Sequence, residues 1–82
     1  MAYNVYIVLC SDGTYYTGIA LDVEKRILEH NTSAKGARYT RSRRPVTLVY
    51  QETCPDKSGA LKREYAVKQM TKAQKTALIA AQ

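Results

Sequence analysis

One stretch of this sequence gathers basic side chains with no acidic residue to balance them. Lysine and arginine neutralise phosphate groups, and an aromatic ring among them offers a face on which bases can stack. The whole chain has 13 Lys and Arg against 7 Asp and Glu, a net charge of +6 at pH 7. This balance favours a phosphate-binding surface over simple solubility. The stretch comprises Lys35, Arg38, Tyr39, Arg41, Arg43 and Arg44.

Two pairs of side chains could bring reactive groups together. Arg26 and His30 are four residues apart, so on a helix both project from one stripe. Tyr6 and Tyr16 lie in two segments of β-branched and aromatic residues that read as a hairpin. A two-residue turn would put these tyrosines on opposite faces. A three-residue loop over residues 11–13 would put them on one face, with Gly18 opposite Tyr6.

The elements that must position these residues form one small domain over residues 1–82. We expect an α/β fold, with a small three-stranded, mainly antiparallel sheet flanked by three helices. The expected strands span residues 4–10, 14–20 and 46–50, and residues 31–45 form a loop with room for one helical turn. The expected helices run from N-cap Asp22 to about His30, where Asn31 could end the first, then over residues 58–70 and from about Lys72.

The second expected helix carries a carboxylate beside its buried side. Glu64 and Lys68 belong to a set that recurs at helical spacing, and this periodicity predicts that Ala60, Leu61 and Tyr65 lie in the core. A turn over residues 54–57 should precede the helix. Glu64 is thereby held at the border between core and solvent.

Composition excludes several classes of protein. Two cysteines, Cys10 and Cys54, in a chain without a recognisable secretion signal favour reduced thiols. No apolar run approaches the length that spans a bilayer. We therefore expect a cytoplasmic protein.

The ordered motifs resemble the GIY-YIG nuclease domain. Val5-Tyr6-Ile7 is followed ten residues later by Tyr16-Thr17-Gly18, and then by Arg26 and His30. Residues 36–40, 43–45 and 60–65 resemble the branch that contains structure-specific nuclease subunits and short stand-alone bacterial proteins. The resemblance covers about residues 3–78, nearly the whole chain.

This resemblance implies Mg²⁺- or Mn²⁺-dependent hydrolysis of phosphodiester bonds in DNA, with branched or single-stranded DNA as the expected substrate in repair or recombination. Glu64 would hold the metal ion, and Arg26 would bind a non-bridging phosphate oxygen. By analogy Tyr6 is the favoured general base, Tyr16 orients water or phosphate, and His30 acts as base or proton relay. The residues expected to bind nucleic acid are Lys35, Arg38, Tyr39, Thr40, Arg41, Arg43, Arg44 and Lys68.

Two other functions remain open at this level. The chain could be a nucleic-acid-binding module that keeps the nuclease fold with weak cleavage, or a subunit that needs a protein partner for targeting. If the tyrosine base needs a cation, Lys68, one turn beyond Glu64, is a candidate on spacing alone.

Overall fold

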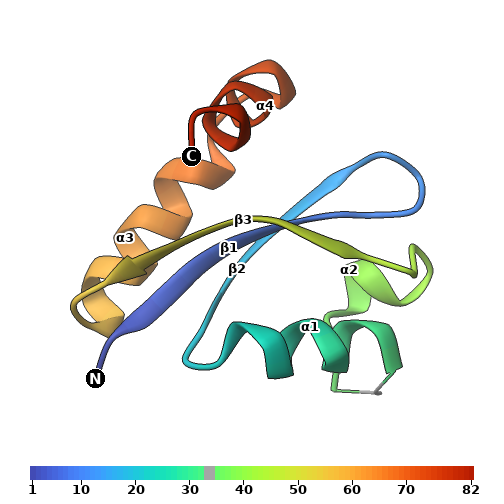
Figure 1. Ribbon diagram of the computed structural model, residues 1–82, viewed down its shortest axis with the longest axis horizontal. Helices are drawn as coiled ribbons and strands as arrows, with labels where there is room; N and C mark the ends of the chain where they lie inside the picture. Colours follow the sequence, from blue (N-terminus) through green and yellow to red (C-terminus); the bar gives the residue numbers. More distant parts are fainter. Residues whose placement is uncertain (33–34) are drawn as a thin grey trace.

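The computed structural model describes residues 1–32 and 35–82, so positions 33–34 of the expected loop lie outside the described residues. Three antiparallel strands form one sheet, as predicted, and their order is β2-β1-β3 (Figure 1). The expected helical turn of the loop is present as α2. The elements are β1 (Tyr3–Leu9), β2 (Tyr15–Ala20), α1 (Val23–Thr32), α2 (Arg38–Arg41), β3 (Thr47–Cys54), α3 (Lys57–Lys68) and α4 (Lys72–Ala80).

Helices cover both faces of the sheet. Figure 1 shows α1 and α2 on one side, and α3 and α4 on the other. Side chains of a strand alternate between faces, so Tyr6 and Val8 of β1 pack with α1, whereas Val5 and Ile7 pack with α3. The central strand is therefore buried on both faces, and it fixes the two helical layers relative to each other.

The hairpin uses the three-residue loop. Gly13 has a positive φ of 83°, which glycine adopts without strain, and the amide of Cys10 donates to the carbonyl of Thr14 over 2.8 Å. Tyr6 consequently pairs with Gly18. This register places Tyr6 and Tyr16 on the same face of the sheet.

Two predicted boundaries were wrong, for identifiable reasons. Helix α1 continues to Thr32 because Asn31 does not end it; the Asn31 side chain instead bonds the backbone of Val46. Strand β3 continues to Cys54, four residues beyond the predicted end. A bulge at Val49, between the pairs Ile7–Tyr50 and Val8–Leu48, interrupts its alternation.

The packing of α3 corrects part of the predicted core. Ala60 is buried as expected, and Val67 lies on the same stripe. Leu61 and Tyr65 are instead 46% and 68% exposed. Helical spacing alone fits several faces, and the sheet accepts only the stripe through Ala60 and Val67.

Helix α4 begins at the predicted capping box, in which Thr71 and Gln74 satisfy each other's backbone amides. It contacts the hairpin through Lys72, whose ammonium donates to the carbonyl of Gly13 over 2.9 Å. Both cysteines are free thiols, as expected. No helix within the described residues is long and apolar enough to cross a membrane.

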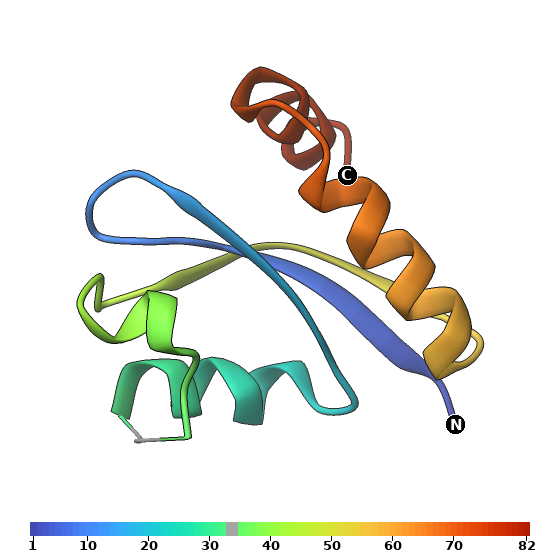
Figure 2. The same cartoon turned by 180° about the vertical axis from the view of Figure 1, so that it is seen from behind.

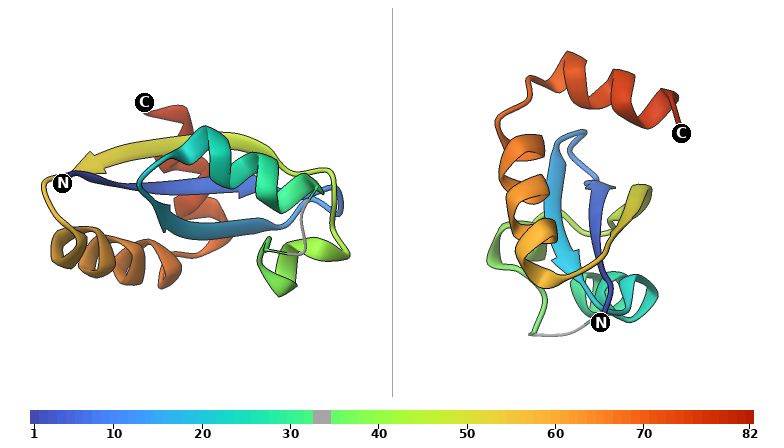
Figure 3. Two further views of the ribbon diagram at one scale, coloured as in Figure 1. Left: turned by 90° about the horizontal axis from the view of Figure 1, so that it is seen from below. Right: turned by 90° about the vertical axis from the view of Figure 1, so that its left-hand side faces the viewer.

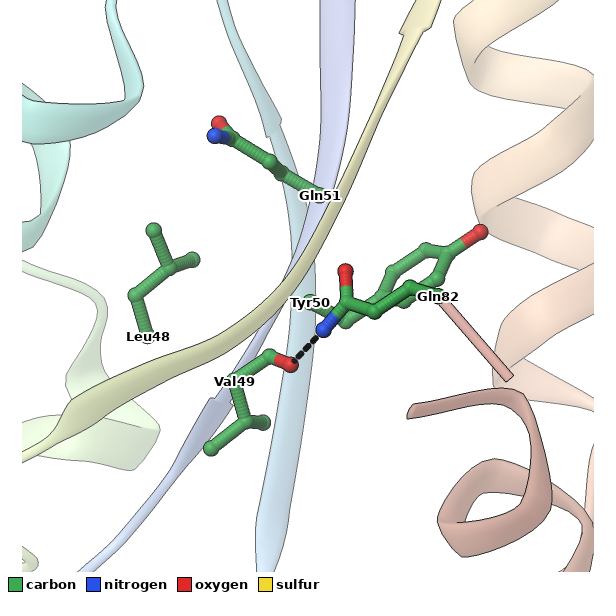
Figure 4. Close-up of a pocket in the computed structure, with 5 residues that line it drawn as sticks. All are labelled: Leu48, Val49, Tyr50, Gln51 and Gln82. Carbon is green, nitrogen blue, oxygen red and sulfur yellow. Dashed lines mark hydrogen bonds between the residues drawn. The ribbon is translucent and has the colours of Figure 1, made fainter. Parts of the chain in front are cut away.

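A hollow of about 200 Å³ lies beside β3 near the C-terminus. Its lining includes Leu48 and Gln51, and the amide of Gln82 closes over it to donate to the carbonyl of Val49 (Figure 4). No carboxylate, histidine or cysteine lines this hollow. It offers no group for acid–base chemistry near neutral pH.

Candidate active site

Gly18 on β2 leaves room for the ring of Tyr6, because glycine has no side chain. A Cβ atom added to Gly18 would lie 2.6 Å from the Tyr6 hydroxyl oxygen and 2.7 Å from the ring carbon that carries it. The ring of Tyr6 therefore extends from β1 across the backbone of β2 at this glycine. Seen from behind, β2 runs in front of β1 (Figure 2). Tyr6 thus carries its hydroxyl over the backbone of β2, where the residue stays buried.

A chain of hydrogen bonds runs inward from this hydroxyl. Tyr6 Oη lies 2.7 Å from His30 Nε2, and His30 Nδ1 lies 2.8 Å from Thr40 Oγ1. The Thr40 hydroxyl donates to the carbonyl of Ala37 over 2.9 Å, which leaves its oxygen to accept from Nδ1. This direction makes Nε2 the acceptor for the Tyr6 proton. The backbone amide of Ala37, at 3.4 Å from Nδ1, is a weaker contact.

Both members of the Tyr6–His30 pair are uncharged near neutral pH. Burial raises the pKa of Tyr6 to about 12, although the Arg26 guanidinium acts in the opposite direction. Burial, with the positive charges of Arg26 and Arg44, lowers the pKa of His30 to about 4. A neutral imidazole with a free acceptor nitrogen therefore faces a neutral phenol.

Arg26 is held in place by two neighbours. Its Nη1 donates to the Glu29 carboxylate over 3.2 Å and to the carbonyl of Lys35 over 2.8 Å. The side chain remains partly exposed. Its charge acts on both Tyr6 and His30, so Arg26 is the cation beside the tyrosine.

Glu64 approaches from the opposite helical layer. It lies on α3, its side chain is 18% exposed, and it forms an ion pair of 3.4 Å with Lys68. Its negative charge makes the smallest contribution to raising the pKa of Tyr6, which puts the two groups within electrostatic range. Lys68 is therefore paired with Glu64, and its action as a cation on the tyrosine stays a prediction.

Tyr16 and the region around α2 complete the arrangement. The Tyr16 ring meets His30 edge-on with centroids 5.3 Å apart, and it stacks on Tyr39 at 5.8 Å. The Arg43 guanidinium covers Tyr39, 3.9 Å from its centroid, and bonds Asp12 over 2.9 Å. These ring contacts connect the buried His30 to Tyr39 and Arg43 at the surface.

The predicted catalytic residues differ in how far their side chains are exposed to solvent. Tyr6 is 1% exposed and His30 is 0% exposed, whereas Tyr16, Arg26 and Glu64 are partly exposed. The first two make the floor of the site. The other three form the part that solvent can reach.

The predicted nucleic-acid-binding residues also differ in exposure. Thr40 is fully buried and engaged by His30, so its side chain positions the imidazole. Arg44 is partly buried, and its Nε donates to the carbonyl of His30. The exposed or partly exposed members are Lys35, Arg38, Tyr39, Arg41, Arg43 and Lys68.

Sequence reasoning missed three supporting contacts. Glu29 holds Arg26, Asp12 holds Arg43, and Ala37 accepts from Thr40. The three-residue spacing of Arg26 and Glu29 on a helix was a usable signal for the first. Ala37 and Thr40 are also three residues apart, whereas Asp12 and Arg43 are 31 apart, so their contact gives no signal of this kind in the sequence.

Glu64 is the residue that could hold a divalent ion. Within residues 1–32 and 35–82 no cluster of three or more His, Cys, Asp or Glu side chains could enclose a metal. Mg²⁺ commonly keeps several waters and binds one or two carboxylates together with substrate phosphates. A single, partly exposed carboxylate fits that mode of binding.

Comparison with known proteins gives one consistent family. The GIY-YIG catalytic domain matches residues 2–77. The chain is 64% identical over 80 residues to the UPF0213 protein DP2720 of Desulfotalea psychrophila, covering 98% of this chain and 73% of that protein. It is 54% identical to the UPF0213 protein VNG_2274C of Halobacterium salinarum, covering 93% and 97% of the two chains.

Solved structures agree with the sequence comparison. The solution structure of the UPF0213 protein BH0048 from Bacillus halodurans has a TM-score of 0.64 and 43% identity, covering 100% of this chain and 86% of that one. The protein EF2693 from E. faecalis has a TM-score of 0.67 and 37% identity, covering 99% and 85%. With its sheet order, its motifs and nearly its whole length in agreement, this chain belongs to the GIY-YIG catalytic domain family.

Proposed function

We propose that this protein is a metal-dependent DNA endonuclease that hydrolyses phosphodiester bonds in branched or single-stranded DNA. The observation that carries the proposal is the 2.7 Å contact between Tyr6 Oη and His30 Nε2. It lies beside a fixed guanidinium and within electrostatic range of a carboxylate. A proton acceptor, a phosphate-binding cation and a metal ligand are the groups that phosphodiester hydrolysis needs.

The hydrogen-bond direction suggests a path for the proton. Tyr6 takes a proton from the attacking water while its own proton passes to His30 Nε2, so a phenolate need not exist beforehand. Thr40 holds the imidazole with Nε2 free to accept. This path favours Tyr6 as base and His30 as relay, because His30 is the next group along the hydrogen-bond chain from the Tyr6 hydroxyl.

Arg26 would stabilise the negative charge that develops on the non-bridging phosphate oxygens in the transition state. Its guanidinium is restrained before substrate arrives by Glu29 and the carbonyl of Lys35. Donors that are already oriented stabilise a transition state without a further reorganisation cost. Tyr16 is the more exposed tyrosine, which suits it to orienting water or phosphate.

Glu64 would hold Mg²⁺ or Mn²⁺, which when bound polarises the phosphate and shields the departing oxygen. Substrate binding would draw on the basic side chains around α2, where Arg38 and Arg41 are exposed. A role in DNA repair or recombination follows if branched DNA is the preferred substrate.

One observation favours a second function. Tyr6 is only 1% exposed, and a general base must reach its water. A nucleic-acid-binding module with weak or partner-dependent cleavage would retain the basic surface and still fit this burial.

The decisive experiment compares wild type with Glu64→Ala on duplex, single-stranded and branched DNA, in Mg²⁺, Mn²⁺ and EDTA. We expect cleavage by Glu64→Ala to fall about a thousandfold or more, as loss of several kcal/mol of transition-state stabilisation requires. DNA binding in EDTA should remain within about twofold, because Glu64 contributes no positive charge to phosphate binding. Glu24→Ala, which removes an exposed carboxylate from the first turn of α1, is the matched control and should cleave normally.

Equal residual activity in wild type and Glu64→Ala across all these conditions would overturn the proposal. Salt-sensitive binding without cleavage would support the binding module. Cleavage that appears only when a cellular fraction is added would support a partner-dependent subunit.

A further inference from the structure

Two large apolar side chains on α3 lie exposed beside the candidate metal ligand. Leu61 is 46% exposed and Tyr65 is 68% exposed, although both belong to the helix that carries Glu64. Figure 3 shows α3 at the edge of the described part of the molecule, with no other element on its outer side. The tyrosine ring is therefore available to a ligand.

The helical geometry puts these side chains on the same flank as Glu64. Successive residues of an α-helix are about 100° apart, so Glu64 projects about 40° to one side of the buried Ala60. Leu61 and Tyr65 follow at about 100° and 140° on that side. Arg63 projects to the opposite side, where it bonds Glu52 of β3 over 2.6 Å. A surface formed by Leu61 and Tyr65 therefore continues outward from the carboxylate.

The charges of α3 limit what could cover this surface. Its exposed charged side chains are all lysines, namely Lys57, Lys62 and Lys68, and its single acidic residue is Glu64. A polyanion complements such a face, whereas a second copy would bring the same positive charges against it. Two side chains also fall far short of the roughly 800 Å² that each partner buries in a stable protein interface.

We propose that Tyr65, flanked by Leu61, is a stacking site for an unpaired nucleobase of the DNA strand at Glu64. The inference rests on the proposed DNA substrate and narrows it to strands with an unpaired base beside the cleaved bond. Bases stack on exposed aromatic rings irrespective of sequence, while lysines engage the neighbouring phosphates. Lys62 and Lys68, on the same helix, are placed for this second role.

Stacking of this kind discriminates between single strands and duplexes. A base within a duplex already stacks on its neighbours and must be unpaired before it can meet Tyr65, whereas a base in a gap, flap or single strand is free to do so. Tyr65 thus supplies a physical reason for a preference that phosphate contacts alone would not create.

The test measures binding without cleavage. Fluorescence anisotropy in EDTA would compare labelled single-stranded DNA with a blunt DNA hairpin for wild type, Tyr65→Ala, Tyr65→Phe and Tyr65→Leu. We expect Tyr65→Ala to weaken single-strand binding by about 5- to 30-fold and hairpin binding by less than about twofold. Tyr65→Phe should keep the affinity, and Tyr65→Leu should lose most of it, because a planar ring is required.

Leu28→Ala is the matched control. Leu28 is 62% exposed on α1, so its loss removes an exposed apolar side chain from a different helix. It should leave binding to both DNAs unchanged. A second measurement would place 2-aminopurine in the single strand; its fluorescence should be quenched at one position by wild type and Tyr65→Phe, and not by Tyr65→Ala.

Equal losses on single strand and hairpin, or a Tyr65→Leu variant that binds as well as Tyr65→Phe, would overturn the inference. The result is independent of the proposed catalysis. A chain that fails to cleave in Mg²⁺ could still show the loss with Tyr65→Ala in EDTA. If the protein cleaves DNA but Tyr65→Ala binds single strands as well as wild type, the proposed function stands and the stacking site is ruled out.

Discussion

The two helical layers that meet at β2 organise their functional side chains in opposite ways. On the side of α1 and α2, Tyr6, His30 and Thr40 are buried and each hydrogen bond fixes the next. On the side of α3, Glu64 forms its ion pair with an exposed lysine. The first layer therefore holds a proton path in one geometry, whereas the second presents individual groups to solvent.

Because of this difference, we expect substitutions in the two layers to affect stability and activity differently. Substitutions in the buried layer remove hydrogen bonds that also support the fold, so both quantities should fall. Substitutions on the exposed face of α3 should change DNA binding or cleavage with little effect on folding. Single substitutions in each layer can test that separation.

Gly18→Ala should damage both quantities most. The added Cβ would lie 2.6 Å from the Tyr6 hydroxyl, so the ring must move. We expect the free energy of unfolding to fall by about 2 to 3 kcal/mol, as overpacking a tight site does. Urea unfolding and a cleavage assay measure the two effects. Gly59→Ala on α3, whose nearest neighbour is the tip of Asp56 at 3.3 Å, should change stability by less than half as much. Equal costs would contradict the steric role given to Gly18.

Two buried threonines give a matched comparison. Thr40 bonds His30, whereas Thr17 Oγ1 is buried with no hydrogen-bond partner among the described residues. Thr40→Val should cost about 2 kcal/mol because it leaves the imidazole unpaired, and Thr17→Val should cost about zero or be stabilising. Thermal and urea unfolding of both variants decide the point. Equal costs at the two positions would contradict the hydrogen-bond account.

Stability should decline with acidity because of His30. Its pKa is about 4 in the folded protein, below the usual value near 6.5, so the unfolded chain binds a proton first as the pH falls. The stabilisation is complete above about pH 6.5 and is lost progressively toward pH 4. Between pH 6.5 and 5 we expect a loss of about 1.5 kcal/mol that His30→Asn does not show. An identical pH profile in this variant would rule out a depressed pKa at His30.

Lys68→Ala should have the smallest effect on stability. Exposed ion pairs contribute less than about 1 kcal/mol, and Lys68 is 49% exposed. Urea unfolding should show a change below that value. If the lysine also binds phosphate, the slope of the logarithm of the DNA-binding constant against the logarithm of salt concentration should decrease in magnitude by about one. A loss of stability comparable to that of Thr40→Val would remove the contrast between the two layers.

The sequence predicted the local features well. The capping box at Thr71 was specific because its two partners are three residues apart, and the three-residue hairpin loop was one of two geometries that Gly13 allowed. The three antiparallel strands also followed from local composition and turn residues. These features depend on neighbours in the chain, which a single sequence contains.

Features that depend on distant packing were predicted less well. Leu61 and Tyr65 were assigned to the core because helical periodicity does not say which of several stripes meets the sheet. The partnership of His30 with Thr40 joins α1 to α2, and no spacing rule connects residues across that loop. The residue types of the site were thus predictable, whereas the burial of each side chain and the hydrogen bonds between them were not.

In the proposed reaction, the buried Tyr6–His30 pair transfers the proton of the attacking water. The most direct measurement is the single-turnover cleavage rate of Tyr6→Phe at neutral pH, with Tyr3→Phe as a control from the same strand. We expect the rate to fall by about a hundredfold or more for Tyr6→Phe and to stay unchanged for Tyr3→Phe, with both proteins folded. Cleavage by Tyr6→Phe at the wild-type rate, while Glu64→Ala is inactive, would contradict this proton transfer.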